Sequence, residues 1–212
     1  MKLLALHGYR QSANLFEKRM QSAKVLCGKE DVGECYFLNG PYFLEGIKIS
    51  NESNYAAGYG WCTISVLDEL APKTWPNISQ YKGLQETIQL IKKEWETKGP
   101  FDGVLGFSQG GLMGSILCHL QESQQFPPFK FAIMIGAYIP SASPWKELYQ
   151  QQHKCSVPTL HIYGQNDPLI PPEWSKLHAQ YFLNPVLWEH DGGHVIPKDK
   201  NKTINNFLKQ FL

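Results

Sequence analysis

The sequence predicts an α/β fold, in which about six mostly parallel strands form one sheet and helices cover both of its faces. Short runs that are apolar throughout alternate with segments of helical spacing along the 212 residues. Such runs are typical of parallel strands, because a strand that is buried on both faces has no polar side. The composition, with 42% hydrophobic and 18% charged residues, also indicates a globular chain rather than a disordered one.

Apolar runs and helical periodicity give the expected order of elements. The predicted strands are residues 3–7, 35–38, 104–107, 131–135, 159–163 and 186–189. The predicted helices are residues 12–26, 81–98, 110–121, 145–152, 172–181 and 201–212. The clearest helix is 81–98, where Leu84, Ile88, Ile91 and Trp95 share one face.

Residues 40–80 follow neither the strand period nor the helix period. They are rich in Tyr, Gly, Asn and Ser, and no linker divides the chain on either side of them. We therefore predict a single domain over residues 1–212, in which 40–80 forms a lid or a substrate-binding excursion, because long irregular segments are usually functional. A surface loop without such a role is the alternative.

The net charge and the pattern of cysteines limit which partners and which cellular compartment we expect for this chain. The net charge of +1 gives no reason to expect nucleic acid. No apolar run approaches the roughly 20 residues of a membrane span, and the N-terminal apolar run is too short for a signal peptide. The cysteines are scattered without a C-x-x-C pair, which favours free thiols and a cytoplasmic protein; they are Cys27, Cys35, Cys62, Cys118 and Cys155. Nothing here predicts an oligomeric state.

The most informative stretch is Gly106-Phe107-Ser108-Gln109-Gly110, which follows an apolar strand and precedes a helix. This G-x-S-x-G pattern between strand and helix is the context of a nucleophile elbow, a sharp turn that raises a serine hydroxyl above the sheet. The following helix directs its positive N-terminal end at the same point. Ser108 is the predicted nucleophile, and a tight turn with an exposed serine is the alternative.

A nucleophilic serine needs a base, and the base needs a carboxylate that orients it. In enzymes with this elbow the order along the chain is Ser, acid, His, each in a loop that follows a strand. Asp167 directly follows the predicted strand 159–163, and His194 follows 186–189. Both residues should therefore reach the carboxyl edge of the sheet where Ser108 lies.

Other acids and histidines are weaker candidates. Asp102 precedes its strand, Asp191 fits a turn position, and Asp68 lies in the irregular segment. His190 competes with His194, but it belongs to the strand, whereas two glycines precede His194. The spacing of the two histidines resembles a zinc pair, but those glycines disfavour a helix and no H-E-x-x-H glutamate is present, so we predict no metal.

The oxyanion of a tetrahedral intermediate needs N–H donors. One donor should be the backbone N–H of Gln109. The other should be that of Tyr9, or alternatively that of Arg10, in the loop that Gly8 allows after the first strand. The alternative for His7-Gly8 is an ordinary turn at the end of a strand. The Arg10 side chain fits an anionic substrate group or a solvated charge. Aromatic residues of the 40–80 segment suggest an apolar acyl pocket or a local core: Tyr42, Phe43, Tyr55, Tyr59 and Trp61.

The chain resembles the FSH-type serine hydrolases, a branch of the α/β-hydrolase superfamily that is related to an ovarian-cancer-associated hydrolase and to fungal polyketide-releasing thioesterases. The resemblance spans the whole chain and is carried by residues 6–12, by the elbow, by Gly164-x-x-Asp167 and by Gly192-Gly193-His194. Ala13 departs from it, since a glycine is expected there. The resemblance implies an α/β-hydrolase fold and hydrolysis of carboxylic esters or thioesters without a cofactor.

These observations predict a serine hydrolase that acts on a small-molecule acyl ester or thioester through an acyl-enzyme. Peptidase or lactonase action by the same residues stays open, because a fold does not fix a substrate. A ligand-binding or signalling protein that keeps the three residues is one alternative. An interaction protein with a vestigial site is another.

Overall fold

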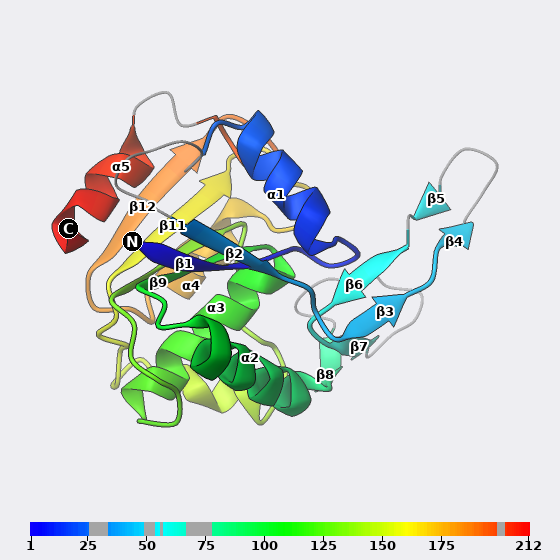
Figure 1. Ribbon diagram of the computed structural model, residues 1–212, viewed down its shortest axis with the longest axis horizontal. Helices are drawn as coiled ribbons and strands as arrows, with labels where there is room; N and C mark the ends of the chain where they lie inside the picture. Colours follow the sequence, from blue (N-terminus) through cyan, green and yellow to red (C-terminus); the bar gives the residue numbers. More distant parts are fainter. Residues whose placement is uncertain (26–33, 49–53, 56, 67–77, 199–201) are drawn as a thin grey trace.

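A six-stranded parallel sheet forms the centre of the protein (Figure 1). The computed structural model describes residues 1–25, 34–48, 54–55, 57–66, 78–198 and 202–212. The strands of the sheet are β1 (Lys2–Leu6), β2 (Glu34–Leu38), β9 (Gly103–Phe107), β10 (Phe131–Ile135), β11 (Thr159–Gly164) and β12 (Pro185–His190). Their order is β12-β11-β10-β9-β1-β2, and every neighbouring pair is parallel. The predicted fold class is confirmed.

Helices pack on both faces of this sheet. They are α1 (Ala13–Ser22), α2 (Leu84–Lys98), α3 (Gln109–Glu122), α4 (Pro172–Ala179) and α5 (Thr203–Leu208), with 3-10 turns at Trp145–Leu148 and Lys209–Phe211. In Figure 1, α1 and α5 lie on one side of the sheet, and α2 and α3 lie on the other. The carboxyl ends of parallel strands share one edge, so the loops that follow β1, β9, β11 and β12 meet there.

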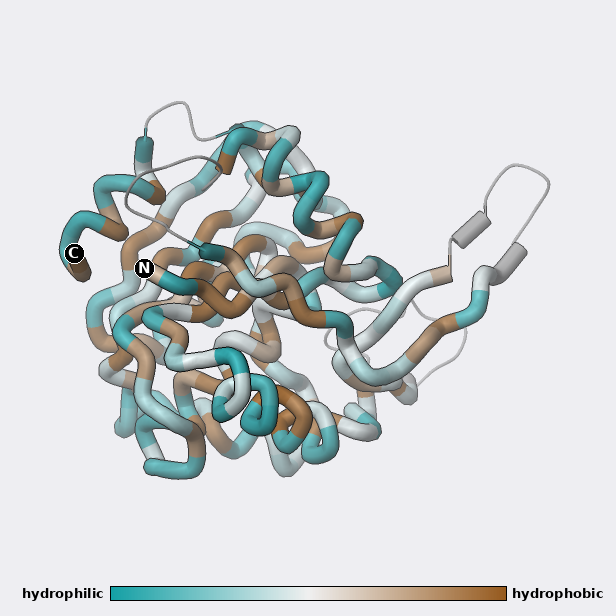
Figure 2. Tube along the Cα trace, viewed as in Figure 1, coloured by the Kyte–Doolittle hydropathy of each residue, from teal (hydrophilic) through white to brown (hydrophobic). Residues whose placement is uncertain are grey.

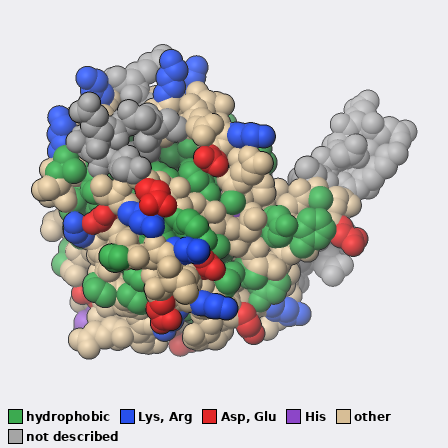
Figure 3. All heavy atoms as spheres, viewed as in Figure 1, with side chains coloured by type: hydrophobic (Ala, Val, Ile, Leu, Met, Phe, Trp, Pro, Cys, Tyr) green, Lys and Arg blue, Asp and Glu red, His purple; other side chains and the backbone are tan. Residues whose placement is uncertain are grey.

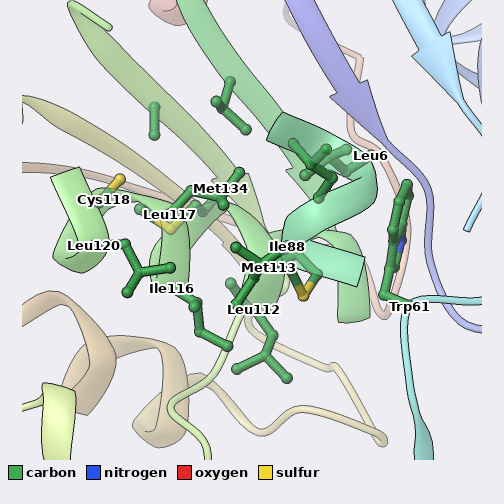
Figure 4. Close-up of a cluster of buried hydrophobic side chains, with 14 of the residues drawn as sticks. Leu6, Trp61, Ile88, Leu112, Met113, Ile116, Leu117, Cys118, Leu120 and Met134 are labelled. Carbon is green, nitrogen blue, oxygen red and sulfur yellow. The ribbon is translucent and has the colours of Figure 1, made fainter. Parts of the chain in front are cut away.

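The core forms because successive strand residues face opposite layers. On β1, Leu3 and Ala5 join the apolar cluster with Phe16 of α1, whereas Leu4 and Leu6 join the cluster beneath α2 and α3. In Figure 2, hydrophobic residues follow the central strands, whereas the outer helices α1 and α2 carry many hydrophilic residues. Figure 4 shows Ile88 of α2 and side chains of α3 in one buried cluster with Leu6 and Met134 of the sheet, and Trp61 belongs to the same cluster.

Several helix boundaries differ from the prediction. The first helix begins after Ser12, whose hydroxyl accepts the Leu15 N–H at 3.1 Å, and it ends at Ser22; residue 26 lies outside the described residues. The second begins at Leu84 rather than at 81, because Gly83 has a φ of 86°, which interrupts the helix. Residues 145–152 form only a 3-10 turn. The last helix begins at Thr203, and residue 201 is not described.

Residues 40–80 contain short antiparallel strand pairs, so the expectation of no regular structure is wrong for the described part. The pairs are β3 (Tyr42–Leu44) with β6 (Gly58–Gly60), β4 (Ile47–Lys48) with β5 (Asn54–Tyr55), and β7 (Thr63–Val66) with β8 (Ile78–Lys82). The β3–β6 and β4–β5 pairs project from the body of the protein (Figure 1). These strands are two to five residues long, too short for a period to be visible in the sequence.

The surface carries charges of both signs. On the face in Figure 3, Lys and Arg side chains lie among Asp and Glu side chains, in keeping with the net charge of +1. Within the described ranges, each helix lacks either the length or the apolar character that crossing a bilayer requires.

Candidate active site

Ser108 occupies a strained turn between β9 and α3. Its backbone angles are φ 54° and ψ −116°, a region that L-residues rarely adopt outside functional turns. Its N–H donates to the Ile135 carbonyl at 2.8 Å, which ties the turn to the end of β10. A Cβ at Gly106 would clash with the Gly110 carbonyl, and one at Gly110 would clash with the Leu6 carbonyl. The G-x-S-x-G glycines are therefore required by backbone contacts.

Replacing Gly110 by Ala is expected to lower the free energy of unfolding by about 1–3 kcal/mol, because the new methyl group meets rigid backbone of β1. Urea unfolding measures the change. Gly114→Ala, one turn further along α3, is the matched control. Its methyl would lie 3.3 Å from a movable Val104 side-chain atom, and Ala favours the helix by up to about 1 kcal/mol. Equal losses in both variants would contradict this account of the elbow.

Asp167 and His194 form a close pair, in which Asp167 is buried and His194 is partly buried. His194 Nδ1 lies 2.6 Å from Asp167 Oδ2, and the N–H groups of Leu169 and Ile170 each donate to Asp167 Oδ1 at 2.9 Å. Burial acts to raise the pKa of Asp167, but the hydrogen bonds from His194 and the two N–H groups outweigh it and lower that pKa. An ionised Asp167 places the His194 proton on Nδ1 and leaves Nε2 as the basic nitrogen.

The His194 loop lies next to the Ser108 turn. The His194 ring packs on Phe107, the residue before Ser108, with ring centroids 4.9 Å apart. Gly136 directly follows Ile135, whose carbonyl accepts the Ser108 N–H. Gly136 also lies next to the imidazole, because a Cβ there would be 3.0 Å from His194 Cε1. The three candidate residues come from the loops after β9, β11 and β12 at one sheet edge.

The rival residues have other environments. Asp102 lies at the opposite edge, where it pairs with Lys130 at 2.8 Å and accepts the Lys2 N–H. The hydrogen bond from Lys130 lowers the pKa of Asp102. His190 ends β12, and its Nδ1 accepts the Gly192 N–H at 3.1 Å. Asp191 is exposed, and residue 68 lies outside the described part. No group of three His, Cys, Asp or Glu side chains suited to a metal ion occurs among the described residues.

The two predicted oxyanion donors, the backbone N–H groups of Gln109 and Tyr9, belong to the start of α3 and to the loop after β1. The close approach of Gly110 to Leu6 and His7 carbonyls brings the start of α3, including Gln109, against the loop after β1. In the described part of the chain, neither the Gln109 N–H nor the Tyr9 N–H donates to a protein acceptor. Arg10 has a φ of 58°, so the loop turns sharply directly after Tyr9.

The predicted pocket residues have different positions. Phe43 is 60% exposed and packs edge-on against Tyr59, whereas the Tyr42 hydroxyl donates to the Gly83 carbonyl at 3.1 Å. Arg10 Nη1 donates to the Glu45 carbonyl at 2.7 Å. Trp61 has no exposed surface, which favours the alternative of a local core for this side chain. Only the backbone of Tyr55 is described.

Sequence reasoning missed the side chains that hold these loops. His7 is fully buried, with Nδ1 2.7 Å from the Gly8 carbonyl oxygen and Nε2 accepting the Gly40 N–H at 3.0 Å. Burial lowers the pKa of His7. The Gln109 side chain is also buried, against the turn at Trp61. The His7-Gly8 dipeptide was the available signal, since a polar residue at the end of a buried strand needs partners.

The fold and the elbow define an enzyme of the α/β-hydrolase class. Residues 1–205 match the family model described as "Serine hydrolase (FSH1)", and the chain belongs to this serine hydrolase family. The prediction of an FSH-type serine hydrolase is thus confirmed.

Relatives and solved structures agree with this assignment. The chain is 31% identical to the Esterase OVCA2 of Danio rerio, covering 100% of this chain and 97% of the relative, and 30% identical to that of Homo sapiens, covering 100% and 96%. Zea mays acyl-protein thioesterase 2 superposes with a TM-score of 0.67 at 15% identity, covering 99% of this chain and 92% of that one. Arabidopsis thaliana SOBER1 gives 0.64 at 16%, covering 99% and 98%. At these identities the structures show the shared fold.

Proposed function

We propose that this protein hydrolyses carboxylic esters or thioesters with Ser108, His194 and Asp167 as a catalytic triad. The observation that carries the proposal is the 2.6 Å Asp167–His194 pair beside the strained Ser108 turn. Membership of the serine hydrolase family supports it, as do relatives named esterases and the fold shared with a thioesterase.

The proposed reaction has two halves. His194 Nε2 takes the Ser108 proton while Oγ attacks the acyl carbonyl, and Asp167 stabilises the imidazolium. The N–H groups of Gln109 and Tyr9 stabilise the oxyanion, aided by the N-terminus of α3. His194 then protonates the leaving alcohol or thiol, which leaves an acyl-enzyme. Water, deprotonated by His194, hydrolyses that intermediate and releases the acid. None of these steps requires a cofactor.

The described part of residues 40–80 is the proposed acyl-binding excursion. Tyr59 N–H donates to the Gln11 carbonyl at 2.7 Å, so β6 is attached directly to the loop that supplies Tyr9. Phe43 and Tyr59 offer aromatic surface on this pair of strands. This placement favours an apolar acyl group over a charged one. The scattered cysteines favour a cytoplasmic location.

Two measurements test the proposal. Wild-type protein is expected to hydrolyse p-nitrophenyl esters and to react with a fluorophosphonate on Ser108, located by peptide mass spectrometry. Ser108→Ala is expected to lose labelling and to lower kcat by about 10⁶-fold, to the background. Turnover of a series of acyl esters and thioesters of increasing length then shows which acyl length the pocket prefers. Wild-type protein that is not labelled and does not turn over these substrates would refute the proposal.

A further inference from the structure

Trp61 joins the two loops that supply the oxyanion donors. It lies in the turn between β6 and β7, and its side chain is fully buried. Resting on the proposed function, we infer that Trp61 is a positioning residue that fixes both donor N–H groups without touching substrate. Three polar groups of this residue have partners on three separate segments, which is the basis of the inference.

The first link reaches the Tyr9 loop through His7. Trp61 Nε1–H donates to the His7 carbonyl at 2.7 Å, and the two rings pack with centroids 4.9 Å apart. Because His7 Nε2 accepts the Gly40 N–H, the His7 proton is on Nδ1, which donates to the Gly8 carbonyl. The Gly8 carbonyl and the Tyr9 N–H belong to one planar peptide and point in opposite directions. Fixing the carbonyl therefore fixes the direction of the donor.

The second link reaches Gln109. Its side-chain Oε1 accepts the Trp61 N–H at 2.9 Å, and its Nε2 donates to the Cys62 carbonyl at 3.2 Å and to Cys62 Sγ at 3.1 Å. The Gln109 amide is thus held on both sides by the same turn. Since the backbone N–H of this residue is the other proposed donor, the turn restrains its orientation too.

The third link anchors the turn to the body of the protein. The Thr87 hydroxyl, on α2, donates to the Trp61 carbonyl. The indole belongs to the buried cluster that also contains Leu6 and Ile88 (Figure 4). The turn is therefore rigid, and it transmits that rigidity to two loops that are about one hundred residues apart in sequence.

Trp61→Phe keeps an aromatic ring and removes the N–H that holds the His7 carbonyl. Losing an oxyanion donor costs about 10²–10³-fold in kcat, and a donor that is loosened rather than removed should cost less. We expect kcat to fall about 10–100-fold, with KM changed by less than about threefold, because acyl-chain contacts are untouched. Gln109→Met, which removes the side-chain amide and keeps the backbone N–H, should act in the same direction.

Trp95→Phe is the matched control. Trp95 is a buried tryptophan of α2 that packs against Phe101 and Phe126, with no hydrogen bond to either donor loop among the described contacts. Thermal unfolding measures what each substitution costs in stability. A trifluoromethyl ketone reports on the oxyanion hole directly: Ser108 Oγ adds to its carbonyl carbon, His194 takes the proton, and the carbonyl oxygen becomes the oxyanion.

The inference requires the inhibition constant of the ketone to rise in proportion to the loss of kcat/KM in Trp61→Phe and Gln109→Met, but not in Trp95→Phe. It is overturned if Trp61→Phe and Trp95→Phe lose kcat equally, if the loss lies in KM alone, or if the inhibition constant stays constant. Wild-type protein that neither hydrolyses the ester nor binds the ketone would instead refute the proposed function, and the inference with it.

Discussion

Replacing Asp167 by Asn is expected to lower kcat for a p-nitrophenyl ester by about 10³–10⁴-fold at neutral pH. The amide can accept the N–H groups of Leu169 and Ile170, so the loop should keep its shape. It carries no charge to stabilise a His194 imidazolium, and its NH₂ group disfavours the tautomer in which Nδ1 bears the proton. The loss should therefore appear in kcat, with KM nearly unchanged.

Asp191→Asn is the matched control for that substitution. Asp191 lies in the same loop as His194, but it is exposed and its backbone carbonyl, not its carboxylate, accepts the Asn166 side chain. Its kcat should stay within about twofold of wild type, since exposed charges interact weakly. If Asp191→Asn is the more damaging change, Asp167 is not the acid of the triad.

The stability of the protein is expected to fall as the pH drops below about 6.5. His119, His161 and His178 are buried together, and burial lowers the pKa of His119 to about 4, that of His161 to about 3, and that of His178 well below its ordinary value. Between these values and 6.5, the unfolded chain binds more protons than the folded one. Each imidazole then costs roughly 1.4 kcal/mol of stability per pH unit, while above pH 6.5 the full stability is present.

His119→Phe isolates one of these groups. His119 Nε2 has no hydrogen-bond partner among the described residues, and the ring packs on Tyr149 and Phe182, so a phenyl ring fits without loss of a bond. Nearby Glu122 acts to raise the pKa of His119 and only partly offsets burial. Urea unfolding between pH 4 and 7 should show a slope reduced by about 1.4 kcal/mol per pH unit. Parallel curves for the two proteins would contradict this explanation.

The central sheet and the elbow could be predicted because their determinants are local. The four inner strands β1, β9, β10 and β11 are short runs of mostly buried residues, and all five residues of β9 are buried, whereas the edge strands β2 and β12 are partly exposed. The glycines of the G-x-S-x-G pattern are needed because a Cβ at Gly106 would meet the Gly110 carbonyl and a Cβ at Gly110 would meet the Leu6 carbonyl. The expected position of Asp167 and His194 near Ser108 then followed from the parallel sheet, which gathers the loops after its strands at one edge.

The remaining features depend on contacts that no local pattern encodes. Trp61 looked like a pocket residue because an aromatic side chain in an irregular segment gives no sign of burial. Its partners, His7 and Gln109, lie 54 and 48 residues away. The start of α2 was also misplaced. The amphipathic pattern continues back through Tyr81, but Tyr81 belongs to β8, and Gly83, with its positive φ, separates that strand from the helix.

The turn at Trp61 and Cys62 has a consequence for anyone who redesigns substrate choice. Segment exchange between homologues is a common route to new selectivity, and the projecting strands β3 and β6 are the natural piece to exchange. A graft that ends inside this turn would alter the turnover rate together with the preference. Keeping Gly40 and the turn at residues 61–62 as fixed crossover points, and varying only the segment between them, should let selectivity change while the rate is preserved.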